Sequence, residues 1–148
     1  MELTSDWVVG FTDGEGCFYV GIYEHPEMSA KYQVLPEFRI VQHKRDVQVL
    51  FALKKFFRCG VVRKNRDDRM ELRIRKISCL SSLVEFFERH PLKTKKNVDF
   101  KRFAKIVRKM ENQEHLTRDG LEKIVRIAAK MNTGEHSRLN EILEKISG

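Results

Sequence analysis

The sequence contains few of the residues that define several common classes of protein. Its 148 residues include three cysteines, Cys17, Cys59 and Cys79, an odd number without a CxxC spacing. Such a set indicates neither a disulfide scaffold nor a zinc knuckle, so we expect small buried thiols in a reducing compartment. The five histidines lack the HExxH or His-Asn-His spacing of metal-dependent hydrolases; they are His25, His43, His90, His115 and His136.

The chain also lacks long hydrophobic runs and phosphate-binding loops. Its most apolar stretch, Leu3–Thr12, is shorter than the ~20 residues that a membrane span needs, and no basic leader or cleavage site accompanies it. Walker A, GxGxxG and GxSxG motifs are absent, which argues against nucleotide-binding enzymes and serine hydrolases. We therefore expect an intracellular protein, in the cytoplasm of a prokaryote or in an organelle, with no membrane partner and no small-molecule substrate.

Positive charge is what the sequence has in excess. The formal net charge is +8 and the isoelectric point is near 9.5, which favours an anionic partner such as nucleic acid. Residues Lys93–Lys109 hold eight basic side chains against Asp99, and Arg63–Lys76 hold seven against three acids. A solvated helical face explains the first run as well. Binding to a membrane surface is a weaker possibility, because the apolar stripe of the same run is needed for packing.

The hydrophobic pattern predicts an α+β fold in one domain, residues 1–148. Strict alternation indicates strands, and apolar residues three and four apart indicate helices. The pattern predicts a first helix that contains the apolar run Leu3–Thr12 and is stopped by Gly14 and Gly16, strands at Cys17–Tyr23, Leu35–Gln42, Val61–Lys64 and Met70–Arg75, and helices at Asp46–Phe57, Ile77–Phe87, 103–110, 121–131 and 139–146.

Two helix-hairpin units in this order make a four-stranded sheet with helices on one face and the other face open. Pro36 is expected near the start of its strand, because proline cannot donate a hydrogen bond within a sheet. Asp119 and Glu122 predict a capping box for one C-terminal helix. Ser137, after Gly134, is a candidate cap for the last helix.

The stretch Trp7–Gly16 combines an apolar helix with an abrupt end of alternating acids and glycines. Gly10 and Gly14 lie four residues apart, so they share one helical face and allow another helix to approach closely. We expect Gly14 and Gly16 to supply the backbone freedom that stops the helix, leaving Glu15 exposed at its tip. An ordinary buried helix with a glycine stop and a solvated acid explains the same spacing.

The nonapeptide VVGFTDGEG resembles the signature of the LAGLIDADG homing endonucleases. Gly10, Asp13 and Gly16 match outright, and Phe11 and Glu15 are substitutions that the family uses. The resemblance implies a core of helix-strand-strand-helix-strand-strand-helix order, with a saddle-shaped antiparallel sheet whose open face binds DNA. It covers about residues 3–110, so the additional C-terminal helices rest on periodicity alone. It also implies an intron-encoded nuclease of the single-motif type, which acts as a homodimer.

The resemblance implies a metal site at the end of the motif helix. It makes Glu15 the metal-binding acid, the Gly14 carbonyl a second ligand and Asp13 a structural acid that ends the helix. The expected ion is Mg²⁺, while Mn²⁺ and Ca²⁺ suit the same oxygen ligands, Ca²⁺ without cleavage. The residues expected where two motif helices meet are Trp7, Gly10, Phe11, Asp13 and Gly14.

Two further residues are implied to act in catalysis. The segment FRIVQ, ending at Gln42, resembles a strand end where the family has a glutamine that orients catalytic water. The segment LKTK, ending at Lys95, resembles the one that supplies a catalytic lysine. Asp46 stands where some relatives have an arginine, so Lys44 or Arg45 would have to replace it. A polar residue at a strand end and a solvated lysine are the simpler explanations of these two positions.

The outward face of the predicted sheet carries residues that can read DNA. Arginine can pair with guanine, glutamate can accept from cytosine, and aromatic rings can contact thymine methyl groups. A charged solvent face with cross-strand pairs of Glu71 and arginine is the competing explanation. The expected DNA-binding residues are Tyr19, Gly21, Tyr23, Glu37, Arg39, Val41, Arg63, Asn65, Glu71, Arg73 and Arg75.

Together these features predict a homodimeric, magnesium-dependent DNA endonuclease that recognises a long, pseudo-palindromic site in double-stranded DNA. The resemblance implies that it hydrolyses one phosphodiester in each strand and leaves 3′ overhangs. The alternative is a non-cleaving DNA-binding protein or an RNA-splicing maturase on the same fold. Cleavage of bound DNA in the presence of Mg²⁺ separates the two.

Overall fold

The computed structural model describes residues 1–131 and 137–147, which fold into two compact units. Unit 1 comprises residues 1–18 and 37–97, and unit 2 comprises residues 19–36 with the described residues from Val98 onward. Each unit is built from segments that are distant in the sequence. The expectation of one domain over residues 1–148 stays a prediction.

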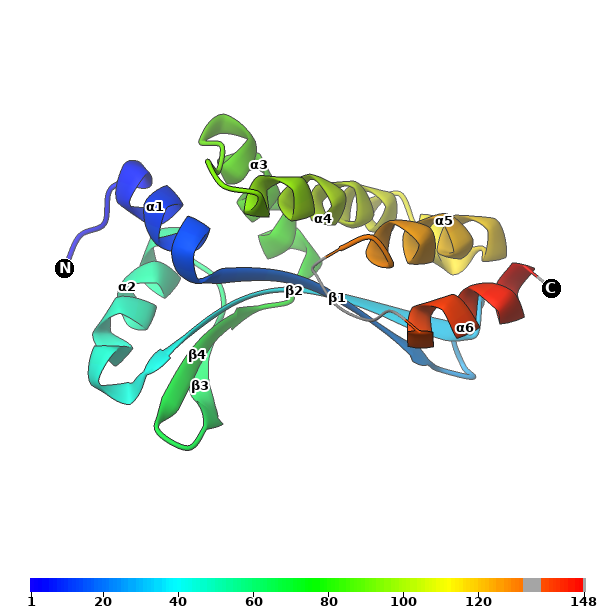
Figure 1. Cartoon of the computed structure of the whole chain (residues 1–148), viewed down its shortest axis with the longest axis horizontal. Helices are drawn as coiled ribbons and strands as arrows, with labels where there is room; N and C mark the ends of the chain where they lie inside the picture. Colours follow the sequence, from blue (N-terminus) through cyan, green and yellow to red (C-terminus); the bar gives the residue numbers. More distant parts are fainter. Residues whose placement is uncertain (132–136, 148) are drawn as a thin grey trace. The chain divides into compact units, whose positions relative to one another are not determined.

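The order of helices and strands agrees with the one predicted (Figure 1). Four strands form one sheet in the order β1-β2-β4-β3, and β4 is antiparallel to both β2 and β3. The predicted α+β class is therefore confirmed. The elements are α1 (Ser5–Glu15), β1 (Gly16–Glu24), β2 (Tyr32–His43), the 3-10 helix η1 (Lys44–Asp46), α2 (Val47–Phe57), β3 (Val61–Arg66), β4 (Arg69–Ile74), α3 (Ile77–Arg89), α4 (Lys96–Glu111), η2 (Glu114–Leu116), α5 (Arg118–Ala128) and α6 (Ser137–Ser147).

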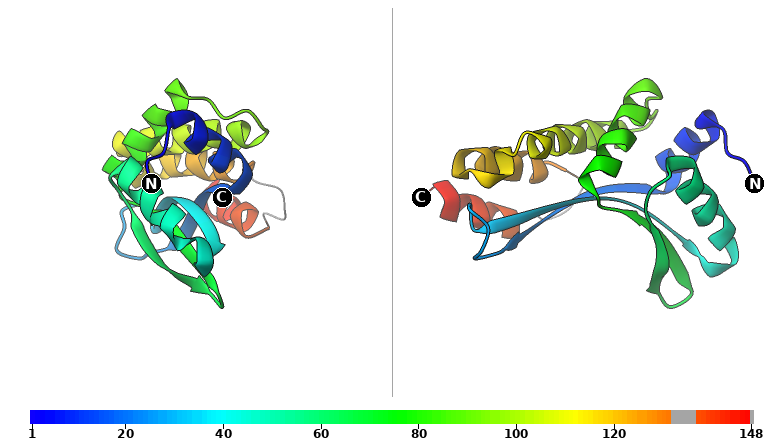
Figure 2. Two further views of the ribbon diagram at one scale, coloured as in Figure 1. Left: turned by 90° about the vertical axis from the view of Figure 1, so that its left-hand side faces the viewer. Right: turned by 180° about the vertical axis from the view of Figure 1, so that it is seen from behind.

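The core of unit 1 lies between one face of the sheet and the helices that follow its strands. Phe38 pairs with Ile74 and Ile40 with Leu72, and all four side chains are buried. Phenylalanine rings from β1, β2, α2 and α3 meet over this face in tilted and edge-on arrangements. Figure 2 shows β3 and β4 as one hairpin with α2 beside it.

A disulfide joins Cys59, which precedes β3, to Cys79 in α3, with their Cα atoms 6.0 Å apart. The expectation of free thiols was therefore wrong for this pair. Strands β3 and β4 form a hairpin between the two cysteines, so the chain turns back and brings two residues 20 positions apart within bonding distance. Cys17 is free and half-buried.

The glycines at the end of α1 act differently from the prediction. Gly14 lies inside the helix, and Gly16 follows it with φ −77° and ψ 155°, which any residue adopts. A Cβ on Gly16 would lie 2.7 Å from Thr12 Cγ2 and 2.9 Å from the Thr12 carbonyl oxygen. Gly16 is therefore needed because a side chain would not fit there, and the prediction that it supplies backbone freedom was wrong.

Strand β2 is longer than predicted, because it begins at Tyr32 and includes Pro36 as an interior residue. The ladder between β2 and β4 starts only at Phe38, so the missing N–H of Pro36 removes no hydrogen bond from it. The expectation that Pro36 lies near the strand start was wrong, because β2 begins at Tyr32 rather than at Leu35.

In unit 2, α5 packs against α6, and the apolar stripes of α4 and α5 are buried, as at Phe103 and Ile124. Helix α5 is capped by Thr117, whose Oγ1 accepts from Gly120 N at 3.1 Å, so the predicted capping box at Asp119 was wrong. Asp119 and Glu122 instead pair with Lys123 and Arg126 along the helix.

Helix α6 begins at Ser137, as its first helical residue, while Gly134 lies outside the described residues. Arg118 holds the end of α6 by donating from Nε to the Ile146 carbonyl at 2.6 Å. Arg138 holds its beginning by donating to the Ile22 carbonyl. Among residues 1–131 and 137–147, no helix has the length and apolar character needed to cross a membrane.

Candidate DNA interface and catalytic helix

Helix α1 in unit 1 has one buried and one open face. Thr4 caps its start by accepting from Trp7 N at 3.2 Å, and its inner face is buried through Val8, Val9 and Thr12. On the outer face, the rings of Trp7 and Phe11 stack with centroids 4.7 Å apart. Trp7 is 41% exposed.

The two glycines of α1 lie beside this aromatic pair. A Cβ added at Gly10 or Gly14 would meet no atom within 4 Å, so neither glycine is required by the packing of this chain. Trp7, Gly10, Phe11 and Gly14 follow helical spacing, so they form one surface. We call these four residues the open face of α1. The two glycines are small and the two stacked rings are flat, so this face suits close approach of a second helix.

Glu15 is the last residue of α1, and its side chain is exposed. Gly14, just before it, contributes a carbonyl in the last helical turn, where carbonyls lack partners within the helix. Both groups are oxygen donors, which suit a hard divalent cation. The described residues contain no cluster of three or more His, Cys, Asp or Glu that could hold a metal. One chain therefore offers suitable ligands in too small a number.

Asp13 is hydrogen-bonded to a segment that lies 80 residues further along the chain. Its Oδ2 accepts from Lys93 N at 2.7 Å, and its Oδ1 accepts from Thr94 N at 3.1 Å and from Thr94 Oγ1 at 2.8 Å. Burial raises the pKa of Asp13, but these hydrogen bonds and the nearby charge of Lys96 outweigh it, so the pKa lies below its ordinary value. Asp13 is thus an ionised structural acid.

Lys95 and Lys96 differ in their surroundings. Lys95, the predicted catalytic lysine, is exposed. Lys96 is half-buried, and its Nζ donates to the Thr12 carbonyl at 3.1 Å, at the end of α1. Sequence reasoning missed Lys96, because a run of lysines gives no signal of which one turns toward another helix.

Gln42 lies near the end of β2, opposite Met70 of β4. Its Nε2 donates to the carbonyl of its own neighbour Val41 at 2.9 Å. The two candidates for the missing arginine are both exposed and paired, Lys44 with Asp68 at 3.3 Å and Arg45 with Asp46 at 3.9 Å. The roles of Gln42 and Lys95 stay predictions.

The sheet face opposite the core of unit 1 carries two cross-strand rows. In one row Arg39 of β2 lies opposite Arg73 of β4. In the next row Val41 lies opposite Glu71, which in turn faces Arg63 of β3. Like charges directly opposite each other destabilise a sheet. An anion bound over Arg39 and Arg73 would remove that cost, so this face suits a polyanion.

The two acids of this face are less exposed than predicted. Glu37 is 4% exposed, because Arg39 contacts it at 3.3 Å and Arg75 at 2.9 Å. Glu71 is 5% exposed and accepts from Asn65 Nδ2 at 2.6 Å. Both acids lie on the predicted outward face but are covered by protein donors, and their roles in DNA binding stay predictions.

These contacts also bear on the competing explanation of Glu71, because its carboxylate accepts from the side-chain amide of Asn65 rather than from an arginine. With both acids occupied by protein donors, the face presents mainly guanidinium groups to a ligand. Among the described residues, no ion pair holds Arg63 or Arg73. The face is therefore electropositive at the positions expected to contact DNA.

Unit 2 carries the tyrosines of the predicted DNA-binding set. Tyr19 is 38% and Tyr23 41% exposed, on the side of β1 that alternates with the buried residues. A Cβ on Gly21 would lie 2.6 Å from the ring of Tyr23, so Gly21 provides space for that ring. Arg138 of α6 lies 4.9 Å over the same ring. Sequence reasoning did not link Arg138 to this strand.

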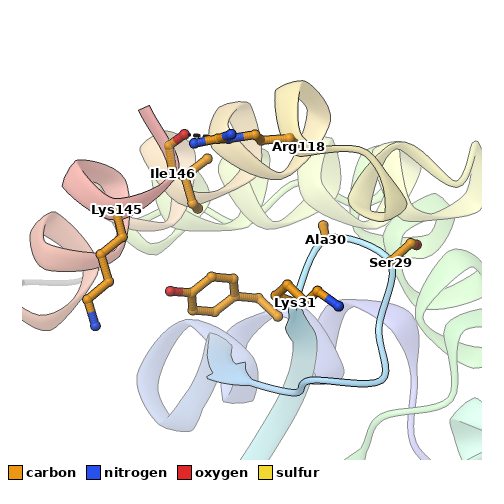
Figure 3. A pocket seen from close by; sticks show the side chains of 7 residues that line it. Ser29, Ala30, Lys31, Arg118, Lys145 and Ile146 are labelled. Atoms are coloured by element: carbon orange, nitrogen blue, oxygen red, sulfur yellow. Dashed lines mark hydrogen bonds between the residues drawn. The ribbon is translucent and has the colours of Figure 1, made fainter. Parts of the chain in front are cut away.

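A cavity of about 300 Å³ in unit 2 is lined by basic residues but does not form an anion site. Figure 3 shows the Arg118 side chain directed to the Ile146 carbonyl, while Lys31 and Lys145 point to opposite sides. Lys31 donates to the Pro26 carbonyl, and Lys145 pairs with Glu24. The three positive charges therefore do not converge.

Comparison with known sequences places this chain beside intron-encoded nucleases. It is 30% identical over 147 residues to the probable intron-encoded endonuclease 2 of Neurospora crassa, covering 97% of this chain and 32% of that protein. It is 27% identical over 111 residues to the DNA endonuclease I-CvuI of Chlorella vulgaris, covering 75% and 68%. The chain thus spans only about a third of its Neurospora relative.

Solved structures agree with these relatives. The homing endonuclease I-TnaI matches with a TM-score of 0.95 and 69% identity over 99% of both chains. I-SmaMI bound to cleaved DNA matches with a TM-score of 0.93 and 32% identity, over 98% of this chain and 49% of the other. A family model described as LAGLIDADG endonuclease matches residues 8–107. The chain therefore belongs to the LAGLIDADG endonuclease family.

Proposed function

We propose that this protein is a site-specific double-strand DNA endonuclease that acts as a homodimer and uses a divalent metal held by Glu15 and the Gly14 carbonyl. The observation that carries the proposal is the end of α1. There an exposed carboxylate stands next to the open face of α1, which no part of the described chain fills.

The homodimer follows from what one chain lacks. A single Glu15 tip has too few ligands for a hard cation, which takes about six. Two open faces packed across a two-fold axis would bring two such tips together, because an isologous contact repeats the same residues. The match to I-SmaMI supports this proposal, since this chain corresponds to about half of that one.

The chemistry assigned to the chain is hydrolysis of one phosphodiester in each strand. A divalent metal would stabilise the leaving oxygen and the attacking water. Glu15 would bind that ion, Gln42 would orient the water, and Lys95 would place positive charge near the scissile phosphate. Mg²⁺ is the proposed ion, and the similar protein I-SmaMI binds an uncleaved DNA target in the presence of calcium ions. The products would carry 3′ overhangs.

Recognition is assigned to the outward sheet residues. Arg39, Arg73 and Arg63 provide donors for guanine and phosphate, and Tyr19 and Tyr23 provide apolar surface for thymine. Each subunit would read about one helical turn, so two subunits would read a long, pseudo-palindromic site.

The test is a cleavage selection on a pool of randomised duplexes about two helical turns long. Wild type is incubated with Mg²⁺ beside Glu15→Gln and a control, Glu122→Gln, which changes an acid paired within α5. We expect wild type and the control to yield one pseudo-palindromic site with staggered ends. Glu15→Gln should bind that site without cutting it, and chelation of the metal should stop cleavage by wild type.

Other outcomes would overturn the proposal. If wild type and Glu15→Gln both enrich a bound duplex and neither cuts it, the chain is a DNA-binding protein without nuclease activity. If structured RNA competes more strongly than every duplex and no cleavage occurs, the maturase alternative replaces the endonuclease.

A further inference from the structure

The connection between α3 and α4 is attached to α1 by polar contacts that run in both directions. The Asp13 carboxylate, on α1, accepts three hydrogen bonds from Lys93 and Thr94 at 2.7–3.1 Å. In the other direction, the Lys96 ammonium, at the start of α4, donates to the Thr12 carbonyl of α1 at 3.1 Å. All these groups belong to unit 1.

The contacts of Asp13 and of Lys96, which we call the two ties, both involve a charged group. The Asp13 contacts are charge-assisted, which makes them about twice as strong as neutral hydrogen bonds. The Lys96 ammonium lies at the C-terminal end of α1, where the helix dipole favours a positive charge. Thr94 Oγ1 joins the two ties, because it donates to Asp13 and accepts from Lys96 N at 3.2 Å.

Lys95 lies between the two tied residues Thr94 and Lys96, and its own side chain is exposed. Glu15 lies two residues after Asp13 on α1, the helix to which this segment is bonded. The ties therefore fix the backbone on both sides of Lys95 relative to the end of α1, and they leave the lysine head available. Reacting groups held in place beforehand lower the entropic part of a barrier.

We propose that Asp13 and Lys96 are positioning residues, which form a two-way latch that holds Lys95 at the Glu15 end of α1. This inference rests on the proposed function, because it needs Lys95 and Glu15 to act on the same phosphodiester. It assigns Lys96 a role that the sequence did not indicate, and it gives Asp13 a purpose beyond ending the helix.

The experiment compares Lys96→Met, Lys96→Arg and Asp13→Asn with wild type and with Lys123→Met, a matched control on the exposed side of α5. Single-turnover cleavage is measured with DNA fully bound, together with DNA affinity in Ca²⁺ and the melting temperature. Lys96→Met should cleave about tenfold to 100-fold more slowly at saturation, with affinity and melting temperature near wild type. Lys96→Arg should recover most of the rate, because arginine can still donate to the Thr12 carbonyl.

Asp13→Asn should show the same loss of rate, since one of the two accepting oxygens becomes an NH₂ group, which cannot accept from the backbone N–H of Lys93 or Thr94 that it faces. Hydrogen exchange should show loss of protection at the amides of residues 93 and 94 in this variant. The latch is overturned if the variants lower affinity or melting temperature while the rate at saturation stays at the wild-type value. It is also overturned if Lys95→Met cuts normally, because Lys95 would then need no positioning.

The failure of the proposed function looks different. If wild type binds DNA and never cuts, the endonuclease proposal falls, and hydrogen exchange alone decides the latch. Selective loss of protection at residues 93 and 94 in Asp13→Asn would support it as a holding device. Unchanged protection would overturn it.

Discussion

The two units use their charged side chains in different ways. In unit 1, Asp13 is held by residues 80 and 81 positions away, and Glu37 by Arg75, 38 positions away. In unit 2, Arg118 and Arg138 reach distant backbone carbonyls, but the acids of α5 pair only with residues four positions away, such as Glu122 with Arg126. A pair of the second type contributes only about 0.3–0.5 kcal/mol. Polar contacts between distant segments fix geometry, whereas pairs along one helix do little more than support that helix.

This difference teaches where function is expected. Unit 1 combines the open face of α1, the Asp13 latch and a sheet face with buried acids, and each of these restricts the position of a side chain. Unit 2 gains its order mainly from apolar stripes on α4 and α5. We therefore expect substitutions in unit 1 to change activity and equivalent substitutions in α5 to change stability slightly. The following variants test that contrast.

The largest effect is expected for Gly10→Leu. Its Cβ meets nothing within the chain, so the fold should tolerate leucine, while a second helix could no longer approach. We expect sedimentation to show monomers and cleavage to fall by at least about 100-fold. Lys123→Leu puts the same side chain on the exposed side of α5 in unit 2, and it should leave both properties unchanged. If Gly10→Leu still forms a dimer that cuts DNA, the open face of α1 is not the dimer interface.

The sequence predicted the features of α1 that depend on spacing within one helix. Gly10, Gly14 and Glu15 could be placed because helical periodicity fixes which residues share a face. The partners of Asp13 could not be placed, since nothing in the spacing of one helix indicates a loop 80 residues away. The burial of Glu37 was missed for a similar reason, because strand alternation gives the face of a residue but not the arginines that cover it.

The disulfide shows the same limit. Two cysteines separated by 20 residues carry no motif, and only the path of the β3–β4 hairpin brings them together. The cap of α5, Thr117, was also not predicted, because several polar residues near the start of this helix could serve as its cap. The order of strands and helices was predictable, since it depends on local periodicity alone.

A smaller effect is expected from breaking the Cys59–Cys79 bond. The bond closes a loop that contains the whole β3–β4 hairpin, and a loop of this length stabilises by about 3 kcal/mol, mainly by restricting the unfolded chain. Reduction, or Cys59→Ser, should therefore lower the melting temperature by several degrees in calorimetry. Cys17→Ser, which changes the free cysteine, is the matched control. Equal melting temperatures with and without reductant would show that the bond contributes nothing to stability.

The smallest of these effects is expected for Arg73→Ala, and its sign is informative. Arg73 lies opposite Arg39, so its removal relieves repulsion, and the melting temperature should stay the same or rise slightly. DNA affinity, measured by anisotropy in Ca²⁺, should nevertheless fall by about 1–3 kcal/mol, because a donor to base or phosphate is lost. Arg126→Ala in unit 2 should behave in the opposite way, losing a little stability and no affinity. If Arg73→Ala lowers stability and leaves affinity unchanged, the arginine row is structural, and the charged sheet face of unit 1 is not the surface that binds DNA.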